Sequence, residues 1–374
     1  MAELTEKKIH ELARLIAPKV KITDWEPYGA QVKVKDTDVE LIGSPISKWF
    51  AVLKTVDKKD RLSDFLTAII KDYDDEQLKT ELEELKKGYS VQLENIVKAI
   101  KTGECILFLG PGVLAITEDN VTKTFNERLA EQVGMLLDEK NKYYDQTQSE
   151  NISYMVQRYK KTVTNNSAEI ADEAIKLYED FTRRFKIDTA VMDQLAKIPW
   201  KLVINTNPDS ILATTMNKAK KDSCLIASYT LENNAGLEFE NPAPGDSQCL
   251  LYNLFGTFEK PSSILYTDSD FLRFNTKVTG DYPPLNEYVI KMFDSQKKYL
   301  FLGFDFDQWY FKILFNKILE LNVDQQNLVS LHCGAMKFNE MNVDYFEEEY
   351  KLYFVNENLV TFVKILLDAY EKLA

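Results

Sequence analysis

A chain of 374 residues with 45% hydrophobic and 12% aromatic residues can hold one large or two ordinary domains, and it is too apolar to be disordered throughout. Its formal net charge of −13 argues against a surface built for nucleic acid, because phosphate backbones recruit clustered Lys and Arg. No run approaches the roughly 18 apolar residues of a membrane-spanning helix, and residues 1–8 lack the apolar core of a signal peptide. We therefore expect a cytoplasmic protein that binds neither nucleic acid nor membrane.

Cysteine and histidine are scarce in this chain. The four cysteines include no Cys-x-x-Cys pair, so a Cys-based zinc site is not expected and disulfides are not implied. The two histidines are His10, which we expect on the surface of a helix, and His332, which ends an apolar run typical of a strand. Catalytic schemes that depend on a histidine base therefore have few residues to use.

Residues 1–88 predict a separate helical domain. Apolar residues at helical spacing indicate helices at 9–16, 62–70 and 78–85. Another helix starts at Ser44 and Pro45, which suit the N-cap and the first turn. Residues 25–43 fit either a small hairpin or a loop. Gly88 is the expected C-terminal cap and the domain boundary.

Residues 89–374 alternate between strand and helix patterns. Apolar runs predict strands at 106–109, 202–204, 250–254, 299–302 and 328–331. Helical patterns lie between them, for example at 125–136 and 310–318, and residues 233–248 predict a loop. Apolar strands separated by amphipathic helices predict the α/β class, with a doubly wound, mainly parallel Rossmann-like sheet and helices on both faces. Ligands of such sheets bind beyond the carboxyl ends of the strands.

Glycine and polar residues follow four of these strands. Gly110-Pro111-Gly112 follows the first strand, where glycines permit a tight turn and a close approach to a ligand, although Ala115 stands where the dinucleotide fingerprint has its third glycine. The second segment is Asn205-Thr206-Asn207-Pro208-Asp209, and the third is Leu251-Tyr252-Asn253-Leu254-Phe255-Gly256-Thr257, with Thr267-Asp268-Ser269-Asp270-Phe271 shortly after it. The fourth is Gly303-Phe304-Asp305-Phe306-Asp307. Taken alone, Asn207 and Asp209 fit a helix N-cap better than a ligand site. The acidic pairs Asp268/Asp270 and Asp305/Asp307 also fit helix caps, and we predict no metal site.

The order of these motifs resembles that of the sirtuin-like domains of bacterial antiphage and conflict-system effectors. Those domains read Gly-Ala-Gly, Thr-Thr-Asn-x-Asp, Leu-His-Gly, Thr-x-x-Asp-Tyr and Leu-Gly-Phe-Ser-x-x-Asp, and the resemblance covers residues 90–374. It implies NAD as substrate or ligand. The cofactor-binding residues that it implies are Gly110, Pro111, Gly112, Thr206, Gly256, Gly303 and Asp305. By the same resemblance Gly110 and Gly112 face the pyrophosphate and Gly303 lies near the adenosine. Asn207 is the implied catalytic residue that handles the ribose and positions water, and Asp209 is the acid that supports it.

One position departs from the pattern of that family. Phe255 stands where the family has a histidine that acts on the ribose hydroxyls, and general acid–base help is typically worth about 10²–10⁴-fold. The leading hypothesis is an NAD-consuming effector that hydrolyses NAD to nicotinamide and ADP-ribose in antiphage or stress signalling. The alternatives are a catalytically degenerate module that binds NAD or ADP-ribose or scaffolds an assembly, and a structural subunit without a ligand. A zinc-containing deacetylase is disfavoured because the paired cysteines are missing, and a related nucleotide in place of NAD stays open.

The first domain has a resemblance of its own. Residues 43–53 and 60–66 resemble the small helical effector-associated domains, which are death-fold-like adaptors that pair with a matching domain on a partner protein. This resemblance implies a protein partner for residues 1–88 and assembly of the chain into homo-oligomers. A helical cap packed on the main domain is the alternative.

Overall fold

The computed structural model describes most of the chain, in two compact units. The described residues are 6–58, 61–73, 75–87, 89–118, 121–165, 168–183, 189–231, 244–245, 247–280, 285, 287–293, 298–304, 306, 308–320, 330–333, 340–350, 352–355 and 357–372. The first unit comprises Met1–Gln92 and Glu340–Phe346, and the second comprises Leu93–Asn339 and Glu347–Ala374.

The first unit contains helices that pack around one apolar core. Its elements before residue 88 are α1 (Glu6–Ile16), η1 (Ile22–Asp24), α2 (Glu26–Gln31), η2 (Asp36–Asp38), α3 (Pro45–Lys58), α4 (Leu62–Tyr73) and α5 (Glu76–Lys87), where η marks a 3-10 turn. Trp49 lies in this core, and its Nε1 donates to the carbonyl oxygen of Val20 at 3.0 Å. The helices expected in this region are confirmed, whereas Gly88, the expected cap, lies outside the described residues.

The start of α3 is as predicted, and the segment before it corrects one expectation. The Oγ atom of Ser44 accepts a hydrogen bond from the Ser47 N–H at 3.2 Å, and Pro45 opens the helix. Residues 25–43, all of them described, contain α2 and η2 and no strand, so the hairpin alternative is wrong. Pro27 lies in the first turn of α2, where its fixed φ favours a helix.

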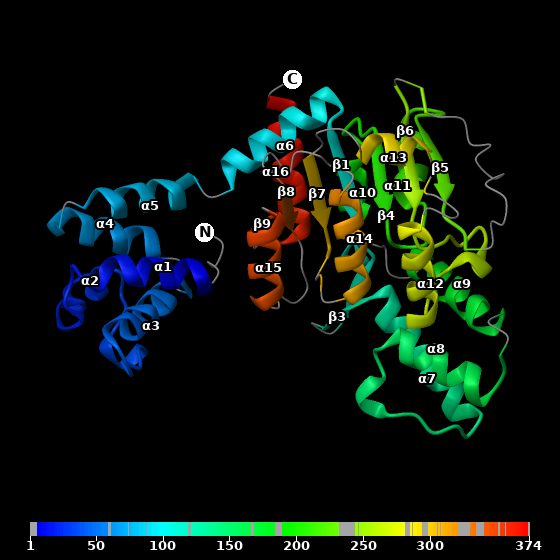
Figure 1. Ribbon diagram of the computed structural model, residues 1–374, viewed down its shortest axis with the longest axis horizontal. Coiled ribbons are helices and arrows are strands. Elements are labelled where there is room, and N and C mark those ends of the chain that lie inside the picture. Colours follow the sequence, from blue (N-terminus) through cyan, green and yellow to red (C-terminus); the bar gives the residue numbers. More distant parts are fainter. Residues whose placement is uncertain are drawn as a thin grey trace. The chain divides into compact units, whose positions relative to one another are not determined.

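The second unit is built on a seven-stranded parallel sheet (Figure 1). Its strands are β1 (Cys105–Leu109), β4 (Leu202–Asn205), β5 (Cys224–Ser228), β6 (Cys249–Asn253), β7 (Lys298–Leu302), β8 (Ser330–Cys333) and β9 (Leu352–Val355). Their order in the sheet is β5-β6-β4-β1-β7-β8-β9. The chain leaves β1 toward β4 and leaves β7 toward β8, so the topological switch point lies between the adjacent strands β1 and β7. The doubly wound α/β prediction is confirmed.

Helices flank this sheet on both faces. The helices from residue 90 onward are α6 (Ser90–Thr102), α7 (Phe125–Glu139), α8 (Ile152–Thr162), α9 (Ala168–Arg183), α10 (Thr189–Leu195), α11 (Ile211–Ala219), α12 (Asp268–Thr279), α13 (Glu287–Phe293), α14 (Trp309–Glu320), α15 (Glu340–Tyr350) and α16 (Leu359–Lys372). Most of α15, Glu340–Phe346, belongs to the first unit. α10 contacts α11 and α16, whereas α12 contacts α14. Right-handed crossovers that run in opposite directions place α10 and α14 on opposite faces. Within the described part of the chain, no helix is both long and apolar enough to cross a membrane.

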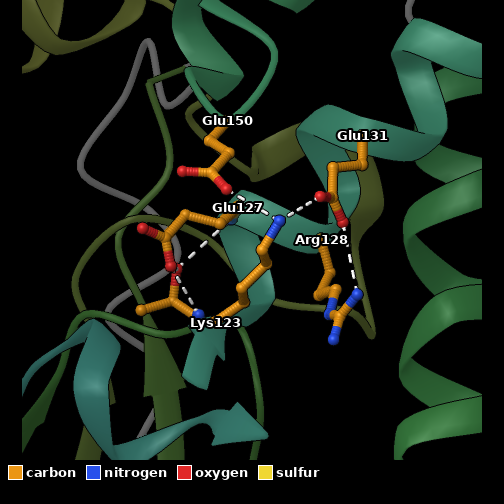
Figure 2. Close-up of polar contacts among 6 residues, drawn as sticks. Lys123, Glu127, Arg128, Glu131 and Glu150 are labelled. Carbon is orange, nitrogen blue, oxygen red and sulfur yellow. Dashed lines mark hydrogen bonds and ion pairs between the residues drawn. The ribbon is translucent and has the colours of Figure 1, made fainter. Parts of the chain in front are cut away.

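A hairpin and three helices are inserted between β1 and β4. The hairpin pairs β2 (Ala115–Glu118) with β3 (Val121–Thr124), and α7, α8 and α9 follow it. The Nζ atom of Lys123 contacts Glu131 of α7 and, at 2.7 Å, Glu150, which precedes α8 (Figure 2). Thr124 and Glu127 form a capping box at the start of α7. These interactions hold the hairpin to the first two helices of the insertion.

The insertion lies at the edge of the sheet where the strands end (Figure 1). Its apolar core includes Leu114, which follows β1, and Tyr266, which follows β6, and Ile211 at the start of α11 packs against it. All three residues belong to segments that leave the carboxyl ends of strands. The fold therefore places α7–α9 beside the edge at which the sequence predicts a ligand site.

Candidate functional site

Four strand ends meet along one edge of the sheet. The strands β6, β4, β1 and β7 are neighbours in that order, and because they are parallel they end at the same edge. Thr206 donates from its N–H and from its hydroxyl to the carbonyl oxygen of Leu109, at 3.0 and 2.8 Å. Gly110 donates to the carbonyl oxygen of Leu302 at 2.8 Å. The predicted site residues that the structure describes at this edge are Gly110, Pro111, Gly112, Thr206, Asn207, Asp209, Gly256 and Gly303.

Gly110 and Gly303 face one another across the switch point. A Cβ atom on Gly110 would lie 2.5 Å from the carbonyl oxygen of Gly303 and 2.6 Å from the ring of Phe304. Gly303 has a φ of +74°, and its Cβ would lie 2.6 Å from the nitrogen of Val113. A Cβ on Gly112 would lie 3.0 Å from the same Gly303 oxygen. Contact between two main-chain turns therefore requires glycine here, before any ligand is considered.

The N–H groups of this glycine turn have acceptors within the chain. Gly112 donates to the carbonyl oxygen of Gly303 at 2.8 Å, and Val113 donates to that of Gly110 at 3.1 Å. Pro111 has no N–H to offer. Because a phosphate held by such a turn needs free N–H groups, a pyrophosphate at this turn would need other donors. The implied contact of Gly110 and Gly112 with the pyrophosphate stays a prediction.

Asn207 is held in one orientation by its amide nitrogen. Nδ2 donates to the carbonyl oxygen of Gly110 at 2.9 Å and to Oδ1 of Asn205 at 3.3 Å. The main-chain N–H of Asn207 also donates to Oδ1 of Asn205, at 3.0 Å. The amide oxygen of Asn207 accepts no hydrogen bond from any residue that the structure describes. The donors of this buried amide are therefore fixed, and its acceptor has no partner among the described residues.

Asp209 is a buried acid, and only one of its two carboxyl oxygens has a hydrogen-bond partner among the described residues. Its Oδ1 accepts a hydrogen bond at 2.9 Å from the N–H of Ile211, the first residue of α11, whereas the N-cap position is Ser210, which makes no side-chain cap. Its Oδ2 is buried, without a partner among the described residues. Burial raises the pKa of the Asp209 carboxyl, because a charge is costly away from water. Asp209 therefore favours the neutral acid more than an exposed aspartate does.

Two asparagines that sequence reasoning missed complete this edge. Asn205 is the register partner of Asn253 on the neighbouring strand, and its Nδ2 donates to the carbonyl oxygen of Asp209 at 2.8 Å. Asn253 is fully buried, and neither atom of its amide has a partner within the described residues. A buried polar group without a hydrogen bond lowers the stability of the folded protein by about 1–3 kcal/mol. Such a group therefore calls for an explanation other than stability. The signal in the sequence that could have indicated them is a polar residue at the last position of each of two apolar strands.

Phe255 lies within a cluster of aromatic rings from two helices. Its ring centroid is 5.2 Å from those of Phe271 and Phe274 on α12, and 5.6 and 5.9 Å from those of Tyr310 and Phe311 on α14. The rings meet mostly edge to face, which is a favourable arrangement. Phe255 is therefore a packed core residue on this side of the edge.

Gly256 directly follows Phe255, and the local structure requires glycine at this position. Its φ is +93°, and a Cβ there would lie 2.4 Å from the main chain of Ser263. The Oγ atom of Ser263 accepts a hydrogen bond from the Thr257 N–H at 3.1 Å. A side chain at position 256 would separate these two segments, so the tight loop after β6 needs glycine.

A comparison with protein families adds to this geometry. Residues 201–355 match the SIR2-like domain. The matched segment runs from the residue before β4 to the end of β9, so it includes Asn207, Asn253 and Gly303, while the glycine turn after β1 precedes it. The match supports the sirtuin-like resemblance for this part of the chain and is consistent with an NAD-related function. No curated protein matches the chain.

The structure also tests the remaining residues that the sequence analysis singled out. Asp305 and Asp307 lie outside the described residues. Asp270 forms a capping box with Thr267 at the start of α12, which confirms a helix-cap role. His332 lies in β8 as expected, and His10, on the first unit, is exposed, with its ring centroid 4.1 Å from that of Phe50.

The close approach of the two glycine turns predicts that Gly110→Ala destabilises the protein by about 1–3 kcal/mol, the usual cost of forcing extra atoms into a packed interior. Urea denaturation measures the free energy of unfolding. The matched control is Gly245→Ala, because a Cβ on Gly245 meets nothing closer than the Gln248 side chain at 3.4 Å. Equal stability of the two variants would contradict the proposed need for glycine.

The buried acid predicts a pH-dependent stability. Folding raises the pKa of Asp209, so the folded state keeps a proton that the unfolded chain loses above about pH 3.9. The contribution of Asp209 to the free energy of unfolding therefore falls as the pH rises from about 3.9 through the folded pKa. Asp209→Asn keeps an acceptor for Ile211 and removes the titration. We expect the variant's free energy of unfolding, relative to the unchanged protein, to rise over that pH range.

Asp145→Asn is the control of opposite sign for that measurement. Hydrogen bonds from Thr147 lower the pKa of Asp145, so its contribution to stability is present above about pH 3.9 and is lost as the pH falls through the folded pKa. Its removal should lower stability near neutral pH and matter less in acid. If Asp209→Asn follows the same trend as Asp145→Asn, the raised pKa of Asp209 is wrong.

Proposed function

We propose that the second unit hydrolyses NAD to nicotinamide and ADP-ribose. The observation that carries this proposal is Asn207, whose two donors are held by Gly110 and Asn205 while its amide oxygen accepts nothing from the described residues. An amide can orient a hydroxyl or a water molecule without titrating. The match of residues 201–355 to the SIR2-like domain supports NAD as the molecule concerned.

The residues of this edge suit the bond that NAD offers. Bound NAD supplies the bond between nicotinamide and ribose, whose rupture develops positive charge on the ribose carbon. The oxygen of Asn207 is a fixed dipole that can face such a charge, and fixed dipoles need no reorganisation as the charge develops. The unpaired atoms of Asp209 and Asn253 lie buried at the same edge. The amide of Asn207 is the group of this edge that suits the hydroxyls of a nucleotide.

A second candidate is a module that binds NAD or ADP-ribose without turnover. Phe255 favours it, because an apolar ring within an aromatic cluster cannot accept a proton where the family has histidine. The internal acceptors of the glycine turn do not separate the two candidates, since both need the nucleotide to bind. Nicotinamide release is what distinguishes them.

We also propose a role for the first unit. It recruits the NAD-consuming unit to a protein partner in antiphage or stress signalling, or joins copies of the chain into oligomers. The helical core around Trp49 and the resemblance of residues 43–53 and 60–66 to effector-associated domains support this proposal. Light scattering of the full chain tests the oligomer, and a monomer at all concentrations would contradict it.

The test of hydrolysis is nicotinamide release from NAD by the full chain, compared with Asn207→Ala. We expect the variant to lose about 10²-fold or more in rate, as when one preorganised group facing developing charge is removed. Asn217→Ala is the matched control, because Asn217 also holds a main-chain carbonyl through Nδ2, that of Cys224 at 2.8 Å, but at the amino end of β5. NAD binding measured by calorimetry without any nicotinamide release would favour the binding module instead.

A further inference from the structure

Glu259 lies on the loop after β6, four positions beyond Phe255. Its carboxylate accepts a hydrogen bond from the Ser210 hydroxyl at 2.9 Å and another from the hydroxyl of Thr257. Ser210 directly follows Asp209, so Glu259 joins the loop after β6 to the loop after β4. The Phe258 N–H strengthens this junction by donating to the carbonyl oxygen of Pro208 at 2.9 Å.

A helix of the insertion faces the same junction. Tyr178 of α9 stacks on Phe258, with ring centroids 4.3 Å apart. Burial first, and then the nearby charges of Asp209 and Glu259, raise the pKa of the Tyr178 phenol, which places both carboxyl groups within electrostatic reach of one side chain. Helix α9 and the loops after β4 and β6 therefore meet at this junction, and Asp209 and Glu259 both lie near Tyr178.

The two carboxyl groups of this pair have opposite environments. Asp209 is buried, and its Oδ2 has no partner among the described residues, which favours the neutral acid. Glu259 is exposed to water and accepts from two hydroxyls. A buried carboxyl group near an exposed one is an arrangement found where two carboxyl groups act as acid and base in one active site.

We propose that Glu259 is the catalytic base of NAD cleavage in this chain, acting on the attacking water molecule. This role rests on the proposed hydrolysis. Glu259 accepts the proton of the water molecule whose oxygen bonds to the ribose carbon. The bond from that carbon to the nicotinamide nitrogen breaks, and its electron pair stays on the ring nitrogen. Glu259 then releases the proton to solvent, so the step needs only NAD and water.

The first test is Glu259→Gln in the full chain, assayed by nicotinamide release. We expect kcat to fall by about 10²–10⁴-fold, the usual worth of a general base, with KM and the NAD affinity from calorimetry little changed. Glu104→Gln is the matched control: Glu104 is also exposed and accepts a threonine hydroxyl, that of Thr102 at 2.8 Å, but it lies at the amino end of β1. The control should retain the full rate.

A second variant separates a base from a structural role. Azide attacks carbon without losing a proton, so sodium azide should restore nicotinamide release to Glu259→Ala but not to Asn207→Ala. Unchanged kcat in Glu259→Gln, or no restoration by azide, overturns the role of Glu259 while hydrolysis by the unchanged protein stands. If the unchanged protein releases no nicotinamide, the proposed hydrolysis fails and this role fails with it.

Discussion

The close approach of the turn after β1 to the turn after β7 is the constraint on which the carboxyl edge depends. Because neither Gly110 nor Gly303 has a Cβ, the two main chains meet directly at the topological switch point. Gly110 then presents its carbonyl oxygen to the neighbouring strand, where it accepts from Nδ2 of Asn207. The orientation of the proposed catalytic amide is therefore set partly by main-chain packing two strands away, and not by its own loop alone.

The edge has an apolar side and a polar side. On the side of α12 and α14, aromatic rings enclose Phe255, and a charge placed among them would lose its hydration. On the side of α9, Asp209, Tyr178 and Glu259 lie together, and Glu259 reaches water. The edge thus has Phe255 on the first side, where the sirtuin-like pattern has a histidine, and two carboxyl groups on the second. The side of α9 therefore suits acid–base chemistry better than the aromatic side that holds Phe255.

The sequence predicted the parts of the fold whose signals are local. β1, β4, β6 and β7 are buried apolar runs, and all four were expected. β5 was missed because it is an edge strand in which only Cys224 and Ala227 are buried and Ile226 is exposed. Asn207 and Asp209 were identified by motif order. Asn253 and Glu259 were not, because their significance arises only when neighbouring strands and loops bring partners to them or leave them without one. The environment of Phe255 likewise depends on helices distant in the sequence.

The hydrogen bond from Asn207 to Gly110 joins residues 97 positions apart, and the strand that completes the edge, β7, begins only at Lys298. Closing such long loops carries an entropic cost that local helices avoid. A chain still emerging from the ribosome can form the helices before residue 88 early, but it lacks the partner turn of Gly110 until Gly303 has been made. The carboxyl edge, and with it the proposed active site, is therefore completed only late in synthesis.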